Sequence, residues 1–143
     1  MAIVITGTPC TGKTELAKKI SEEKGLKTIN ITELLRERGL DTEWDAKRHC
    51  FIVDVVELTR LLNELMENDS NIIIEGHLSH YLEPRHVTRC IVTKTDLKEL
   101  KRRLEARGYD DDKVRENLDC EIFDTCHQEA MEHGHSPEVI WTG

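Results

Sequence analysis

The chain has 143 residues, 34% of them charged, and its 28 acidic against 20 basic side chains give a formal net charge of −8. This length suits one domain with a single hydrophobic core, and the acidic surplus argues against sequence-specific contact with nucleic acid and favours a basic partner. No apolar run reaches the length of a membrane span, and Met1 leads straight into an apolar segment, so we expect a cytoplasmic protein without membrane contact.

A glycine-rich loop follows the first predicted strand, which covers residues 2–6. The loop, residues 7–14, reads GTPCTGKT and is a complete G-x-x-x-x-G-K-T phosphate-binding motif. Glycines at both ends let the backbone N–H groups converge on phosphate, and Lys13 adds positive charge at the β- and γ-phosphates. Thr14 offers a hydroxyl to Mg²⁺, and a helix from about Gly12 to Gly25 points its positive end at the phosphates. The segment predicts a site for a nucleoside triphosphate with Mg²⁺.

Residues 27–75 alternate between strand and helix patterns. Residues 27–30 predict a short strand, and residues 33–37 predict a short helix that Gly39 ends. Residues 54–67 predict a core-facing helix, because apolar side chains recur at helical spacing and Asp54 suits the N-cap. The inward side chains of that helix would be Val55, Leu58, Leu62 and Leu65. The β-branched run over residues 72–74 predicts a fully buried strand.

Residues 87–142 continue the alternation, beginning with a strand over 87–93. Asp96 and Glu99 resemble a capping box that opens a helix ending at Gly108. Its inward side chains would be Leu97, Leu100 and Leu104. A long helix is predicted over residues 112–131, and a last strand over 139–142. One side of that long helix carries Val114, Leu118, Ile122 and Cys126.

These elements predict an α/β fold with a five-stranded parallel sheet flanked by helices, in one domain over residues 1–143. An α/β domain normally follows its last strand with a helix that packs on the sheet. We therefore expect a C-terminal helix to be missing after Gly143.

An acidic residue and a histidine follow the buried strand at 72–74. Glu75 is placed to hold the water shell of the Mg²⁺ bound at Thr14. The alternative is a carboxylate that merely caps the strand end. His77 could orient a water molecule or contact phosphate, or it could be a structural histidine.

Two arginines lie four residues apart near the end of the helix that Gly108 closes. Phosphoryl transfer needs cations that close over the developing charge, and Arg103 and Arg107 share the helix face that could supply them. The alternative is that these arginines are solvated partners of Glu99 and Glu105.

Two further groups of polar residues suggest other kinds of site. The cysteines, at positions 10, 50, 90, 120 and 126, are odd in number and predict reduced thiols, and the group Cys120, Cys126, His127, His133 and His135 lacks paired zinc-ligand spacings. Residues 93–96, TKTD, resemble a guanine-reading element. A small GTPase is disfavoured because the chain has no Asp-x-x-Gly switch and Asp96 already serves as a helix cap.

Over nearly its whole length the chain resembles the adenylate kinase isoenzyme 6 family, in an archaeal form. The resemblance rests on the phosphate loop, residues 29–31 with Arg36, the acidic-x-His element at 75–77, RLEARGY at 103–109 and CEIF at 120–123. The Arg-Gly-Tyr and Cys-Glu-Ile-Phe combination is far more specific than the phosphate loop alone.

The resemblance implies a P-loop nucleoside monophosphate kinase fold, with a monophosphate-binding segment at about 30–53 and a short lid at about 106–116. Arg36 would contact AMP, Arg107 would close onto ATP, and Lys13, His77 and Arg107 would be catalytic. ATP would be held by Gly7, Cys10, Gly12, Lys13, Thr14, Glu15, Arg103 and Arg107, and Mg²⁺ by Thr14 and, through water, Glu75.

The family resemblance implies two activities. One is phosphoryl transfer from ATP to AMP, and the other is ATP hydrolysis that assists small ribosomal subunit maturation through a ribosomal protein. The alternative is an ATP-dependent assembly factor in which AMP phosphorylation is incidental. Three positions depart from the family pattern: Glu75 replaces a commoner aspartate, Cys10 a commoner glycine, and Glu15 a frequent hydroxyl residue.

Overall fold

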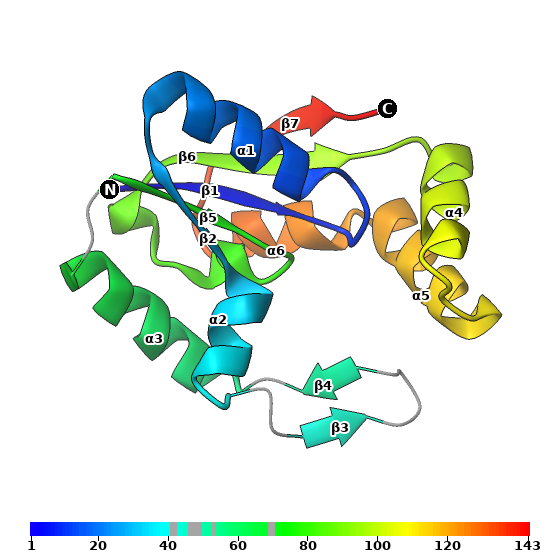
Figure 1. Ribbon diagram of the computed structural model, residues 1–143, viewed down its shortest axis with the longest axis horizontal. Helices are drawn as coiled ribbons and strands as arrows, with labels where there is room; N and C mark the ends of the chain where they lie inside the picture. The colour runs from blue at the N-terminus through cyan, green and yellow to red at the C-terminus, as the bar shows by residue number, and fades with distance from the viewer. Residues whose placement is uncertain (41–42, 46–49, 53, 69–70) are drawn as a thin grey trace.

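A parallel sheet forms the centre of the molecule. The computed structural model describes residues 1–40, 43–45, 50–52, 54–68 and 71–143. Within these residues, five strands pair in parallel in the order β2-β5-β1-β6-β7 (Figure 1). They are β1 (Ala2–Gly7), β2 (Lys27–Asn30), β5 (Ile72–Glu75), β6 (Val87–Lys94) and β7 (Glu138–Trp141). The predicted fold class is confirmed.

Helices cover both faces of the sheet, because side chains alternate along each buried strand. Ile3 and Ile5 of β1 pack against Ala17 and Ile20 of α1 (Lys13–Lys24). Val4 faces the opposite side, where α2 (Ile31–Glu37), α3 (Val55–Asn68) and α6 (Thr125–Glu132) cover the sheet (Figure 1). The core is therefore a three-layer arrangement with the strands buried in the middle.

Two expected core residues near helix starts are exposed. Asp54 does cap α3, since its Oδ1 accepts from the backbone N–H of Val56, but Val55 is 44% exposed. Asp96 likewise caps α4 (Leu97–Ala106), where Leu97 is 42% exposed. Val55 and Leu97 are each the first residue of their helix, and the side chains that pack on the core begin one turn later. Leu61 takes a core position in α3 that the predicted spacing omitted.

The prediction of one long helix over residues 112–131 is wrong. It is broken into α5 (Asp111–Ile122) and α6 by Asp124, whose φ is 58°. A left-handed residue cannot continue an α-helix, so the chain changes direction there. Ile122, expected to face inward, is 57% exposed as a result, and Phe123 is 73% exposed.

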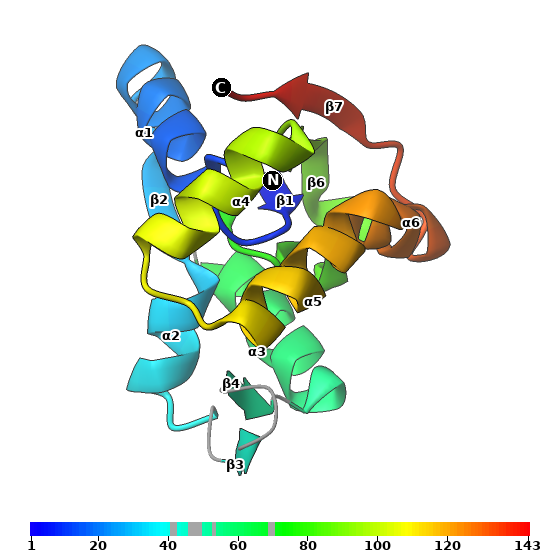
Figure 2. The ribbon, with the colours of Figure 1, turned by 90° about the vertical axis from the view of Figure 1, so that its right-hand side faces the viewer.

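Helix α4 packs beside α5 at the end of the sheet where the phosphate loop lies (Figure 2). Leu100 and Leu104 of α4 meet Val114 of α5 in a small separate core that includes Cys10. Two 3₁₀ turns, Ser79–Tyr81 and Pro84–His86, connect β5 to β6.

The predicted monophosphate-binding segment contains elements that the sequence pattern did not predict. Strands β3 (Glu43–Asp45) and β4 (Cys50–Ile52) pair antiparallel below α2 and α3 (Figure 1). Residues 41, 42, 46–49 and 53 of this segment lie outside the described residues.

Candidate functional site

The phosphate loop needs glycine at both ends for steric reasons. Gly7 has a φ of 150°, and a Cβ added there would lie 2.4 Å from the side-chain oxygen of Thr93. Gly12 has a φ of 87° and is the N-cap residue of α1. The backbone can therefore turn directly from β1 into the start of α1, which is the geometry that binds phosphate.

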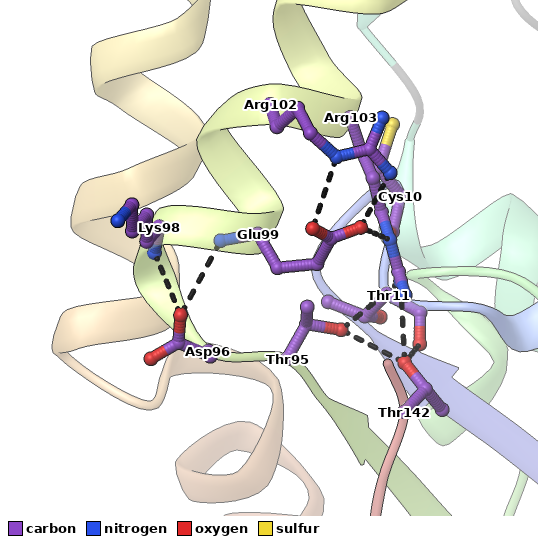
Figure 3. Close-up of polar contacts among 9 residues, drawn as sticks. All are labelled: Cys10, Thr11, Thr95, Asp96, Lys98, Glu99, Arg102, Arg103 and Thr142. Carbon is purple, nitrogen blue, oxygen red and sulfur yellow. Dashed lines mark hydrogen bonds and ion pairs between the residues drawn. The ribbon is translucent and has the colours of Figure 1, made fainter.

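Cys10 is the strained point of this loop, with a φ of 70° that glycine adopts more readily. Its carbonyl oxygen accepts a hydrogen bond of 3.0 Å from Nη1 of Arg103 (Figure 3). The next carbonyl, that of Thr11, accepts one of 2.6 Å from the Thr142 hydroxyl. The loop is thus held from outside by α4 and by the residue after β7.

Lys13 lies across the loop. Its Nζ donates hydrogen bonds to the carbonyl oxygens of Gly7 and Thr8, and each bond is 2.9 Å long. Burial lowers the pKa of Lys13 to about 8, although the charge of Glu75 partly opposes that shift. The ammonium is mostly charged at pH 7 and incompletely solvated, so it can gain from an anionic phosphate.

Thr14, Glu75 and Asn30 meet at the carboxyl ends of the parallel strands. Glu75, only 3% exposed, ends β5 and accepts from the Thr14 hydroxyl at 3.1 Å and from Nδ2 of Asn30 at 2.6 Å. Register explains the meeting, because Glu75 pairs with Ile5 of β1 on one side and Asn30 of β2 on the other. A buried carboxylate beside a hydroxyl is an oxygen set of the kind that Mg²⁺ prefers.

Asn30 was missed as a site residue. Its Oδ1 accepts from the N–H of Glu33 and caps α2, while its Nδ2 orients Glu75. An asparagine before a short helix signals a cap, but only the strand register reveals the second bond.

His77 lies in the loop after Glu75 and Gly76. Desolvation by neighbouring protein atoms, followed by the positive charge of Lys13, lowers the pKa of His77 to about 4, although the residue is exposed at the surface. The imidazole is therefore neutral at pH 7 and can accept a proton or orient a water molecule.

Comparison with known proteins identifies the family. Residues 3–124 match the family described as "AAA domain". The chain is 40% identical to the "Putative adenylate kinase" of Methanocaldococcus jannaschii, over 88% of this chain and 70% of that protein. It is 34% identical to the "Adenylate kinase isoenzyme 6 homolog" of Dictyostelium discoideum, over 96% of this chain and 78% of that protein. The chain belongs to the adenylate kinase isoenzyme 6 family. Membership supports an adenylate kinase-like function.

Solved structures of other kinases share the fold of this family member. Shikimate kinase from Acinetobacter baumannii superposes with a TM-score of 0.69 at 15% identity, over 99% of this chain and 83% of that one. Deoxyadenosine kinase from M. mycoides gives a TM-score of 0.56 at 16% identity, over 98% and 90%. At these identities the likeness concerns the P-loop kinase fold alone. No helix in the described ranges is long and apolar enough to cross a membrane.

Arg103 and Arg107 differ in their surroundings. Arg103 is half-buried, and its Nε donates to Oε1 of Glu99 at 3.2 Å while Nη1 holds the Cys10 carbonyl. The partnership with Glu99 therefore exists for Arg103, but it orients the arginine toward the loop. Arg107 is exposed as the C-cap residue of α4, and its positive charge contributes to lowering the pKa of Lys13.

Two residues expected to bind nucleotide lie on exposed helix surface. Glu15 is in the first turn of α1, and Arg36 is in the last turn of α2. Their expected contacts with ATP and AMP stay predictions.

Glu121, the acidic residue of the Cys-Glu-Ile-Phe motif, is a further site residue that sequence reasoning did not assign. It is 7% exposed, accepts from the Thr8 hydroxyl at 3.2 Å and from the Thr95 N–H at 2.9 Å. It thereby ties α5 to the phosphate loop and to the end of β6.

Two residues of the cysteine and histidine group lie beside polar atoms of other residues. Sγ of Cys126 lies 3.9 Å from the carbonyl oxygen of His77, and Nδ1 of His127 lies 3.1 Å from Asp124. Asp96, the acidic residue of the TKTD segment that resembles a guanine-reading element, accepts from the backbone N–H groups of Lys98 and Glu99 as the cap of α4.

Proposed function

We propose that this protein transfers the γ-phosphoryl group of ATP to AMP. The observation that carries the proposal is the meeting of the Lys13-bearing loop with the Thr14, Glu75 and Asn30 cluster at one edge of the sheet. A phosphate-binding loop, a cation and an oxygen donor set for Mg²⁺ are the parts that phosphoryl transfer requires.

The residues present fit a Mg²⁺ ion. Thr14 would hold it through the hydroxyl and Glu75 through water, and the ion would neutralise charge on the phosphates. Asn30 keeps the Glu75 carboxylate turned toward Thr14. The metal role of Glu75 is supported by its burial in contact with Thr14, which a carboxylate that only capped the strand would not require.

Lys13 and the arginines supply charge during transfer. Lys13 would release the Gly7 and Thr8 carbonyls and pair with the β- and γ-phosphates, where the N–H groups of the loop converge. Arg107, at the start of the short lid over about 106–116, would close onto ATP, and Arg103 would fix the loop that receives it. Gly7, Cys10, Gly12 and Glu15 would contribute the remaining contacts to the ATP phosphates.

Arg36 would bind the phosphate of AMP from the monophosphate-binding segment at about 30–53. Its place on α2 supports this, because the N-cap residue of α2 is Asn30, which directly contacts the Glu75 carboxylate. The chain 1–143 would then act as a single P-loop kinase domain in the cytoplasm.

ATP hydrolysis is a second activity that the His77 environment favours. A neutral imidazole near Lys13 can orient water in place of AMP. In that mode the protein would serve as an assembly factor for the small ribosomal subunit, and the net charge of −8 suits a basic ribosomal protein as the partner.

Steady-state assays with the full chain test the two modes. ATP consumption is measured with Mg²⁺ while AMP is varied, for the wild type and for His77→Ala. The kinase proposal predicts ADP formation that saturates with AMP and survives better in His77→Ala than phosphate release does. A rate of ADP formation that does not depend on the AMP concentration would contradict the kinase proposal.

A further inference from the structure

One side chain joins the end of β5 to α2, the helix that carries Arg36. Asn30 is both the last residue of β2 and the N-cap residue of α2. Its Nδ2 donates to Oε1 of Glu75 at 2.6 Å, and its Oδ1 accepts from the backbone N–H of Glu33 at 3.0 Å. The two ends of one amide group therefore contact two different parts of the proposed site.

The residue type at position 30 suits this double contact. Serine, aspartate and asparagine cap a helix about equally well, because each offers a side-chain oxygen to the first turn. Of these three, only asparagine adds an N–H donor at the far end of its side chain, and here that donor faces Glu75. The opposite orientation of the amide would set two donors together at Glu33 and two acceptors together at Glu75. The cap alone would not require asparagine, whereas the link to Glu75 does.

A close apolar contact holds the same two segments together. A Cβ added at Gly76 would lie 3.0 Å from Cβ of Ile31, the first residue of α2. Ile31 is only 1% exposed and packs in the core beneath the sheet. The helix has seven residues, so a displacement of its first turn also moves Arg36 in its last turn. The segment after Glu75 and the start of α2 are thus in contact through a polar bond and through packing.

The two oxygens of Glu75 have different partners. Oε1 accepts the short bond from Asn30, while Oε2 lies 3.3 Å from the Thr14 hydroxyl and has no nearer donor among the described residues. Glu75 is only 3% exposed, so bulk water does not replace a donor that is lost from this side chain. Oε2 is therefore the oxygen left for a water molecule of the Mg²⁺ shell, and Oε1 is the oxygen tied to α2.

We propose that Asn30 is a positioning residue that couples the two halves of the site, so that Mg²⁺-ATP and AMP each strengthen the binding of the other. It acts through the Glu75 side chain on one side and through the cap of α2 on the other. The inference rests on the proposed function, which gives Glu75 its metal role and Arg36 its acceptor role. Coupling between two binding sites is reciprocal, so each ligand changes the affinity of the other by the same factor.

The sign of this coupling follows from the order that the link imposes. With Oε2 engaged by the Mg²⁺ shell, Glu75 keeps one orientation and the Asn30 amide keeps its donor bond. The cap on the N–H of Glu33 is then fixed as well. AMP meets a helix that is already ordered, and its binding loses less conformational entropy.

Calorimetric titration of AMP into the full chain measures the coupling without turnover. It is done with and without Mg²⁺ plus a non-hydrolysable ATP analogue. In the wild type, Kd for AMP should fall about fivefold when Mg²⁺ and the analogue are present. Asn30→Asp keeps the cap and the side-chain shape but replaces the donor with an acceptor, and Asn30→Ser keeps a cap that is too short to reach Glu75. In both variants Kd for AMP should no longer respond to Mg²⁺ and the analogue.

Asp54→Ser is the matched control for these titrations. Asp54 caps α3 through the backbone N–H groups of Val56 and Glu57, so this variant exchanges a helix cap away from Glu75. It should keep the wild-type ratio of the two Kd values. A wild-type ratio in both Asn30 variants would overturn the proposal, and so would a Kd for AMP in the wild type that Mg²⁺ and the analogue leave unchanged.

Hydrogen exchange of α2 separates the Asn30 link from the proposed function. Protection of residues 31–37 should rise in the wild type when Mg²⁺ and the analogue are added, and should not rise in Asn30→Ser. A rise over residues 13–24 of α1 in both proteins shows that both bind the analogue. If the wild type bound no AMP while α2 responded in this way, the acceptor assignment would fail and the link would stand. Equal protection of α2 in the two proteins would overturn the link itself.

Discussion

Arg103 donates a hydrogen bond of 3.0 Å from Nη1 to the carbonyl oxygen of Cys10. This bond joins α4 to Cys10, the one non-glycine residue of the phosphate loop with a left-handed backbone. The same Nη1 lies 3.3 Å from the hydroxyl oxygens of Thr95 and Thr142 (Figure 3). Glu99 holds the other end of the guanidinium. A strained loop conformation persists when its surroundings fix it, and here the surroundings are this guanidinium.

Replacing Arg103 should therefore weaken ATP binding through the loop. Arg103→Lys loses the forked donor set and about 1.5–3 kcal/mol for a charged hydrogen bond, so KM for ATP should rise about tenfold or more. Arg102→Lys is the matched control, because Arg102 also pairs with Glu99 but its side chain is 67% exposed. Equal KM values for the two variants would show that the Cys10 contact is unimportant.

Lys13 should cost stability while it serves activity. Burial lowers its pKa from 10.5 to about 8, so the unfolded chain holds this proton more tightly than the folded protein does. The cost of burying the charge is full below pH 8 and disappears as the pH rises toward 10.5. The free energy of unfolding of Lys13→Met should therefore be about 1 kcal/mol higher than that of the wild type at pH 7. This difference should shrink above pH 8.

The same variant should lose at least about 10²–10³-fold in turnover, since a cation at the transferring phosphate is removed. Chemical denaturation at pH 7 and pH 10 measures the stability, and Lys18→Met on the exposed face of α1 is the control. A stability difference that stays constant between these pH values would argue against the burial of the Lys13 charge.

Local residue patterns predicted the sheet and the phosphate loop because those features depend on neighbours in sequence. The β-branched run at 72–74 predicted a strand buried on both faces, and residues 72–74 are buried. The glycines at 7 and 12 stand where the backbone has a positive φ and where a Cβ would be crowded. Contacts between distant segments were not predictable in this way. Asn30 reaches Glu75 across 45 residues, and that contact exists only because β2 and β5 pair in register.

The break between α5 and α6 shows a second limit of sequence patterns. Apolar spacing continued through the break, and no glycine or proline marked it. Asp124 takes the left-handed conformation where its carboxylate contacts Lys94 of β6, and this tertiary ion pair is invisible to helical periodicity.

Glu75 should govern the response to Mg²⁺. Glu75→Gln keeps the side-chain volume but removes the charge, so turnover should fall about 10²-fold and the Mg²⁺ concentration for half-maximal activity should rise. Glu67→Gln, on the exposed end of α3, is the control. An unchanged Mg²⁺ dependence in Glu75→Gln would reduce this carboxylate to a structural partner of Thr14 and Asn30.

Arg36 should affect the acceptor far more than the donor. Arg36→Ala removes a cation for the AMP phosphate, so KM for AMP should rise about tenfold or more while AMP-independent ATP hydrolysis changes little. Lys19→Ala, which removes an exposed cation from α1 on the other face of the sheet, is the control. If AMP phosphorylation survived Arg36→Ala intact, the acceptor assignment would be wrong.

The fate of the γ-phosphoryl group is the most direct test of the kinase proposal. ATP labelled in that group is incubated with Mg²⁺, AMP and the wild-type chain, and labelled ADP is separated from labelled phosphate. Transfer to AMP predicts that most of the label enters the β-position of newly formed ADP. Label recovered only as free phosphate, whether or not AMP is present, would contradict the kinase and leave a hydrolysing assembly factor.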